Sequence, residues 1–188
     1  MNLSALTAVD LILIVLLAGA FLLGLFQGSI RIFMALGAWV VSFVAAAHLR
    51  DPVGAWLNSQ WRDVAPEYGE MIAFGFIFLL LFVASLLLIQ GGYRRAPRLT
   101  NTPLVDELIG GVGGLVIGLL VIAATVVALD FFYADGRTLG QREVGWIADL
   151  NQALSTSALA DGLRASVIPV LGTLLGPLLP SAVTAVMR

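Results

Sequence analysis

Long uncharged runs of apolar residues, separated by short polar stretches, dominate the chain. Four runs have the composition of membrane-spanning helices: Leu11–Phe26, Ile32–Ala47, Met71–Ile89 and Leu108–Leu129. A helix needs roughly 20 such residues to cross a hydrocarbon core about 30 Å thick. Extending the first run to that length brings Asp10 into it. The pattern therefore predicts an all-α membrane protein with a bundle of four transmembrane helices.

A fifth apolar stretch, Ser166–Met187, is uncharged and long enough to span, but helix-breaking residues interrupt it. These residues are Pro169, Gly172, Gly176, Pro177 and Pro180. Proline removes a backbone donor, and in lipid the freed carbonyls need other partners. We expect a Pro-broken helix that is re-entrant or interfacial and packs against the bundle, with a fifth span as the alternative.

Two polar stretches carry apolar residues at helical spacing. In Pro52–Tyr68 they are Val53, Trp56, Leu57, Trp61 and Val64. In Glu143–Ala165 they are Ile147, Leu150 and Leu154. Such stripes fit amphipathic helices that lie on the membrane, where indole rings suit the headgroup zone, and equally helices that pack on the bundle ends. We divide the chain into a four-helix transmembrane domain, residues 1–135, and a C-terminal amphipathic and re-entrant region, residues 136–188.

Composition narrows the classes of function. The chain is 60% hydrophobic and 12% charged, with a net charge of −2, whereas soluble domains average about 25% charged residues. Few basic residues argue against nucleic acid as a partner. The absence of cysteine excludes disulfides and thiolate sites, and one histidine, His48, is too few ligands for most zinc or haem sites. We expect no metal and no other cofactor.

Catalytic motifs are missing as well. The sequence contains no G-x-S-x-G, no G-x-G-D and no lysine for a phosphate-binding loop. We therefore predict that the protein is not an enzyme.

Small residues recur at helical spacing in two of the runs. The fourth run carries Gly110, Gly114 and Gly118. The first run carries the weaker row Ala20, Gly24 and Gly28. Membrane helices associate by close backbone approach, because lipid tails are as apolar as leucine. Two interpretations fit: a close crossing of the first and fourth helices, or self-pairing of the fourth helix across a dimer.

Charged residues at the ends of the runs are the other candidates, because ionisable groups in a membrane are costly and often functional. Arg31 opposite Asp106 fits a charge-assisted hydrogen bond between the first hairpin and the fourth helix. At the other boundary, Asp10, His48 and Asp130 fit a proton relay, but solvated helix ends are the commoner explanation.

Arginine positions predict the orientation. Arg94, Arg95 and Arg98 cluster in the loop after the third run, on the side of Arg31. The opposite side holds more scattered arginines, namely Arg50, Arg62, Arg137 and Arg142. Because basic loops favour the cytoplasm, we expect the N-terminus and the C-terminal region outside.

Two motifs resemble the colicin V production protein family. The stretch from Gly24 to Arg31, followed by Trp39, is similar to that family's G-x-x-R-G-x-x-R-E and later Trp. The stretch Val105–Gly118 is similar to its L-D-R-x-x-G-x-x-x-G-x-x-x-G. Asp10 and Ser157 match an acidic residue near the start and a C-terminal serine. The chain departs from the family pattern at Gln27, Ile32 and Glu107.

The resemblance implies a multi-pass protein of the bacterial inner membrane, with about four helices, associated with production or export of a peptide toxin and with envelope homeostasis. Two functions follow as hypotheses. One is a non-enzymatic membrane scaffold that forms a homo-oligomer or binds other membrane proteins. The alternative is a small oligomeric channel or transporter subunit.

Overall fold

A computed structural model of the chain describes residues 7–60, 66–92, 103–133 and 145–187, and all regular structure within these ranges is helical. The long helices are α1 (Ala8–Gln27), α2 (Ser29–Gln60), α3 (Pro66–Gly92) and α4 (Pro103–Tyr133). The C-terminal elements are α5 (Gly145–Ser155), α6 (Ala158–Gly162), the π-helix η2 (Leu163–Val167), α7 (Ile168–Leu175), the 3₁₀-helix η3 (Gly176–Leu178) and α8 (Ser181–Val186).

The four predicted spans lie within α1, α2, α3 and α4, which confirms the predicted fold class. By length and composition, five helices are apolar enough to cross a membrane, the fifth being the continuous stretch Ala158–Leu178. The chain is therefore a multi-pass membrane protein.

The second helix is longer than the sequence pattern indicated. It does not stop at Ala47 but continues through Pro52 to Gln60. Residues 52–60 are thus the last turns of α2, and the prediction of a separate surface helix over Pro52–Tyr68 is wrong in this part. A proline costs a helix one hydrogen bond, but here the packing of Gly54 against the Glu70 backbone keeps the helix on α3. Trp61 and Val64 lie outside the described residues.

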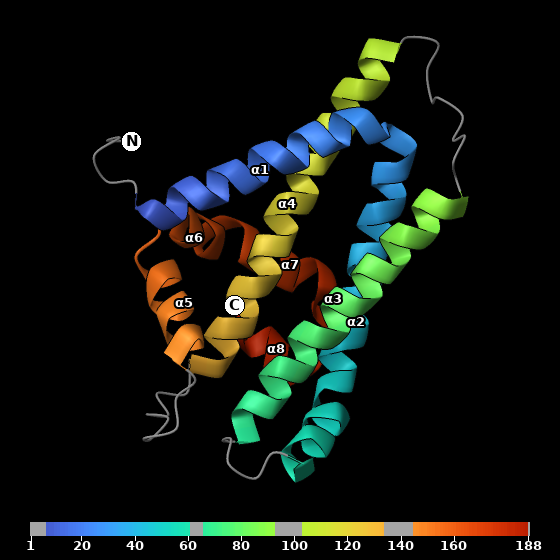
Figure 1. Ribbon diagram of the computed structural model, residues 1–188. Helices are drawn as coiled ribbons and strands as arrows, with labels where there is room; N and C mark the ends of the chain where they lie inside the picture. Colours follow the sequence, from blue (N-terminus) through green and yellow to red (C-terminus); the bar gives the residue numbers. More distant parts are fainter. Residues whose placement is uncertain (1–6, 61–65, 93–102, 134–144, 188) are drawn as a thin grey trace.

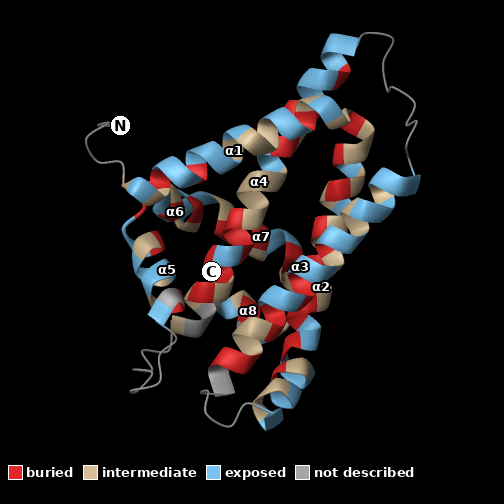
Figure 2. Ribbon diagram, in the orientation of Figure 1, coloured by how far each residue is buried: buried red, intermediate tan, exposed pale blue. Residues whose placement is uncertain are grey.

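The helices associate as two antiparallel pairs. α1 packs along α4, α2 packs along α3, and α2 also contacts α4 (Figure 1). Most apolar side chains on the outer faces are exposed, as the pale-blue surfaces of α1 and α3 show (Figure 2). An apolar outer surface is expected of helices that face lipid.

The stripe predicted for Glu143–Ala165 divides at a break after Ser155. α5 buries Ile147 and Leu154, whereas Leu150 is 38% exposed. Because the two buried residues belong to the main apolar cluster, α5 packs on the bundle rather than forming a soluble unit. The proline-rich stretch is broken as predicted, with a π turn before Pro169 and a 3₁₀ turn at Pro177.

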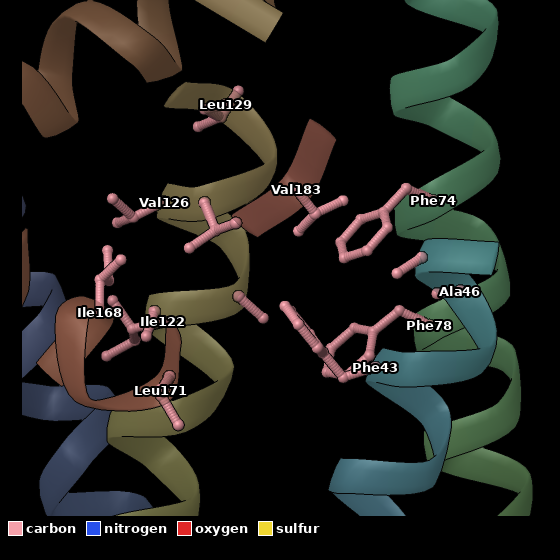
Figure 3. Packing of buried hydrophobic residues seen from close by; sticks show 14 of the residues in the cluster. Phe43, Ala46, Phe74, Phe78, Ile122, Val126, Leu129, Ile168, Leu171 and Val183 are labelled. Atoms are coloured by element: carbon pink, nitrogen blue, oxygen red, sulfur yellow. The ribbon is translucent and has the colours of Figure 1, made fainter. Parts of the chain in front are cut away.

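The core lies between the two helix pairs. Stacked aromatic rings from α2 and α3 form one side of it, with Trp39 and Phe43 5.0 Å apart and Phe78 edge-on to both. α4 forms the other side, and Val183 of α8 lies between them (Figure 3). The C-terminal region is therefore part of the same core as the transmembrane helices.

Candidate functional site

The crossing of α1 and α4 brings the two rows of small residues face to face. A Cβ atom on Gly114 would lie 2.9 Å from the Gly24 Cα, and one on Gly110 would lie 3.0 Å from the Gly28 Cα. A Cβ on Gly118 would lie 3.0 Å from the Ala20 Cβ. Real Cβ atoms are rarely this close to a neighbour, so only glycine permits the observed separation of the two backbones.

The direction of these contacts shows that α1 and α4 are antiparallel, since Gly118 faces Ala20 while Gly110 faces Gly28. The sequence allowed either a close crossing of the first and fourth helices or self-pairing of the fourth helix across a dimer. The structure shows the crossing within one chain. Because α1 covers Gly110, Gly114 and Gly118, this face of α4 is not available to a second copy while α1 is docked.

One end of the crossing is anchored by Asp106. Its Oδ1 accepts a hydrogen bond from the Ser29 backbone N–H at 3.2 Å and a short one from the Ser29 Oγ. Ser29 is the first residue of α2, where backbone N–H groups have no partner within the helix. A carboxylate in the first turn of α4 therefore caps the start of α2.

Gly28 makes this anchor possible. Its φ of 73° and ψ of 169° belong to a region that essentially only glycine occupies, and the chain turns there from α1 into α2. A Cβ at this position would also lie 2.8 Å from Oδ2 of Asp106. Arg31 lies one turn further along α2 and is half-buried; its pairing with Asp106 remains a prediction.

The start of α1 is anchored by Asp10, which is fully buried. Its Oδ2 accepts hydrogen bonds from the backbone N–H and the hydroxyl of Thr7, both at 2.9 Å, within a capping box. Its Oδ1 accepts from the Ser157 hydroxyl at 2.6 Å and from the Leu159 N–H at 3.1 Å. Ser157 in turn accepts from the Ala160 N–H and caps α6. Asp10 thus joins two helix N-termini far apart in sequence.

A third anchor joins the end of α4 to the π turn. The Arg164 guanidinium makes a bidentate pair with Asp130, with N–O distances of 2.8 and 2.9 Å. Its third nitrogen donates to Asp161 at 3.0 Å. Both Arg164 and Asp130 are 27% exposed, so water competes with this pair only in part.

The predicted relay of Asp10, His48 and Asp130 has no hydrogen-bonded path among the interactions of the described residues. His48 is exposed, and its Nδ1 lies 2.9 Å from the Val44 carbonyl of its own helix. Asp10 bonds to the start of α6 and Asp130 to η2. Across the described ranges, no group of three histidine or acidic side chains is arranged to hold a metal ion.

The sequence arguments missed four of the side chains that complete these anchors, namely Thr7, Ser29, Asp161 and Arg164. Ser29 follows a glycine at a helix junction, which is a recognisable capping signal. Arg164 lies five residues before Pro169, but only the fold brings it to Asp130. The arginines used to predict orientation in the loops, namely Arg62, Arg94, Arg95, Arg98, Arg137 and Arg142, lie outside the described residues.

Comparison with known proteins gives consistent results. The sequence model of the family described as colicin V production protein matches residues 9–163. A colicin V production protein homolog from Haemophilus influenzae is 29% identical over 124 residues, which cover 66% of this chain and 74% of that protein. No solved structure shows a significant match. The matched range contains the glycine crossing and the residues of all three anchors except Thr7 and Arg164.

Proposed function

The chain belongs to the colicin V production protein family, and on that premise we propose that it is a non-enzymatic scaffold of the bacterial inner membrane. It would support toxin production and secretion or envelope homeostasis by holding other membrane proteins, or further copies of itself, against its lipid-facing helices. The observation that carries the proposal is the α1–α4 crossing. A close backbone interface anchored at both ends gives a rigid frame.

The partner surface must lie away from the glycine rows, because α1 and α4 cover each other there. The exposed faces of the long helices remain. Val15 of α1, Val41 of α2 and Leu88 of α3 are 70%, 68% and 76% exposed. These positions lie on three different helices of the bundle.

The proposal is tested by placing a photo-crosslinking amino acid at Val15, Val41 or Leu88 in cells that produce the intact protein. We expect a protein adduct, homomeric or heteromeric, from at least one face. Phe43, which is fully buried, is the matched control and should give only crosslinks within the chain. If all three exposed positions yield lipid adducts alone, the scaffold proposal is wrong.

The second candidate, a channel or transporter subunit, is favoured by the broken C-terminal helix, since broken helices form the sites of many transporters. Proton transport through Asp10 has less support, because both oxygens of this carboxylate already accept hydrogen bonds. Flux through proteoliposomes that is unchanged by Asp10→Asn would exclude proton transfer through this group.

We further propose that the N-terminus and the C-terminal region face the outside. Reporter fusions at Leu99 and Arg188 test the orientation. If the chain crosses the membrane four times, the reporter at Leu99 lies in the cytoplasm and the reporter at Arg188 lies outside it. A fifth full span would place both reporters on the same side.

A further inference from the structure

The C-terminal apolar stretch folds back on itself as a helical hairpin. A Cβ on Gly172 of α7 would lie 2.9 Å from the Met187 carbonyl oxygen, and one on Gly176 would lie 3.4 Å from the Thr184 Cγ2. These contacts place α8 antiparallel to α7. We call α7, η3 and α8, residues 168–186, the C-terminal hairpin.

Polar anchors hold the segment before the hairpin at one membrane boundary. Ser157 is bonded to Asp10 at the start of α1, and Arg164 is bonded to Asp130 at the end of α4. Because α1, α2, α3 and α4 each cross the membrane, the end of α4 lies on the same side as the start of α1. We call this the Asp130 side, and we call the opposite one, where Asp106 caps α2, the Asp106 side.

The hairpin returns to the Asp130 side without crossing the membrane. Gly172 follows Arg164 by eight residues, which is at most about 12 Å of helix, and Met187 lies beside Gly172. The opposite boundary is about 30 Å away. Figure 3 shows Ile168 near Ile122 of α4, and Val183 nearer to the end of that helix. The hairpin therefore lies in the leaflet on the Asp130 side.

The exposed face of the hairpin is apolar. Val170, Leu174 and Leu178 follow one another at intervals of four residues and are 55%, 68% and 54% exposed. The whole stretch Ser166–Met187 carries no charged residue. Large apolar surfaces are rarely left in water, so in a membrane protein this face contacts acyl chains. The hairpin thus fills space in one leaflet that lipid would otherwise occupy.

The leaflet on the Asp106 side holds less protein. There α1 and α4 are in backbone contact, since a Cβ on Gly110 or Gly114 would lie 3.0 or 2.9 Å from a Cα atom of α1. Figure 1 shows the two helices diverging toward the Asp130 side, where α6 contacts both of them. The bundle is therefore narrow on the Asp106 side and wide on the Asp130 side.

We propose that the protein acts as a membrane wedge that accumulates where the membrane is convex on the Asp130 side. Both leaflets hold the four long helices, but only one also holds the two arms of the hairpin. A helix is about 10 Å across, so two arms add at least about 160 Å² of cross-section to that leaflet. Apolar elements inserted into one leaflet respond to curvature, because bending makes room for them. The wedge goes beyond the scaffold role, since a bundle without protein partners would have the same shape.

Sorting between a giant vesicle and a narrow tube pulled from it tests the proposal. The whole protein is reconstituted and labelled from outside with an impermeant maleimide dye, which is selective because the chain has no cysteine of its own. Ser155→Cys, exposed on α5, marks the molecules whose Asp130 side faces outward. Glu107→Cys, exposed on α4 next to Asp106, marks the molecules of the opposite orientation.

The two labelled populations should respond to the tube in opposite ways. The outer surface of a tube is convex, so the ratio of protein dye to lipid dye should be higher in the tube than in the vesicle for Ser155→Cys. For Glu107→Cys, the matched control in the same membrane, this ratio should be lower in the tube. Equal ratios for the two populations, or the reverse order, would overturn the wedge.

The position of the hairpin is measured separately. A fluorophore attached at Leu174→Cys should be quenched by lipids brominated in their acyl chains and not by aqueous iodide, because position 174 faces lipid. Quenching by iodide alone would show that the hairpin lies outside the bilayer, and the wedge would then be wrong. Val170→Cys, on the same exposed face, provides this test if Leu174→Cys does not fold.

Discussion

Replacing Gly114 by alanine tests the role of the α1–α4 crossing directly. The added Cβ would lie 2.9 Å from the Gly24 Cα and closer still to the Ala20 carbonyl oxygen. Ordinary van der Waals contact begins near 3.4 Å, so the two backbones must separate by about 0.5–1 Å. A gap of that size forfeits about a quarter to a half of each dispersion contact it opens.

The expected cost follows from the same contacts. Overpacking a close interface destabilises a protein by about 1–3 kcal/mol, and in lipid no hydrophobic effect between helices compensates for the loss. The matched control is Gly75→Ala on α3, because Gly75 is also within a long helix and a Cβ there would meet nothing within 4 Å. This control should raise stability by up to about 1 kcal/mol through helix propensity alone.

The free energy of unfolding, obtained by denaturant titration in mild detergent, checks the prediction. It should fall for Gly114→Ala and not for Gly75→Ala. If Gly114→Ala is as stable as the control, the close crossing does not hold the bundle.

Three further substitutions test the polar anchors by unfolding in detergent. Ser29→Ala removes the hydroxyl that donates to the buried Asp106 carboxylate and should lower the free energy of unfolding by about 1.5–3 kcal/mol. The control Ser59→Ala loses only an exposed bond within its own helix and should change stability little; equal effects would contradict the Asp106–Ser29 anchor. Asp10→Asn presents N–H groups to existing donors and should cost about 1–3 kcal/mol, and a neutral result would show that these bonds do not stabilise the fold. Arg164→Lys loses the bidentate pairing with Asp130. A double-mutant cycle with Asp130→Ala should give a coupling free energy of about 1–2 kcal/mol between the two residues. Zero coupling would show that the pair does not stabilise the fold.

Local sequence patterns were sufficient to predict the spans and the broken C-terminal stretch. An uncharged run of the length of Met71–Ile89 has few alternatives in an all-helical membrane chain, and the three prolines interrupt the last stretch as expected. The predicted end of α2 was wrong. Contact between Gly54 and Glu70 supports the helix beyond Pro52, although proline by itself favours a break. Tertiary packing overrode the local preference there.

The partners of the charged residues were harder to predict than the residues themselves. Asp10, Asp106 and Asp130 were recognisable because charge at a membrane boundary is costly. Their partners depend on which helix ends meet, and Ser157 is 147 residues from Asp10. No periodicity carries that information, since a serine at a helix start looks the same whether it bonds to water or to a distant carboxylate.

The glycine rows and the two aspartate–serine anchors have different roles in the α1–α4 crossing. Glycine rows allow close approach but fix the register weakly, because one glycine fits opposite another at every fourth residue. The anchors restrict this freedom: Asp106 bonds to Ser29 at one end, and Asp10 bonds to Ser157 at the other. A slip of α1 along α4 by one turn, about 5.4 Å, would break the first anchor and pull α6 away from its cap at the second. The dispersion contacts therefore hold the helices together, while the buried carboxylates determine which of several equivalent registers the bundle adopts.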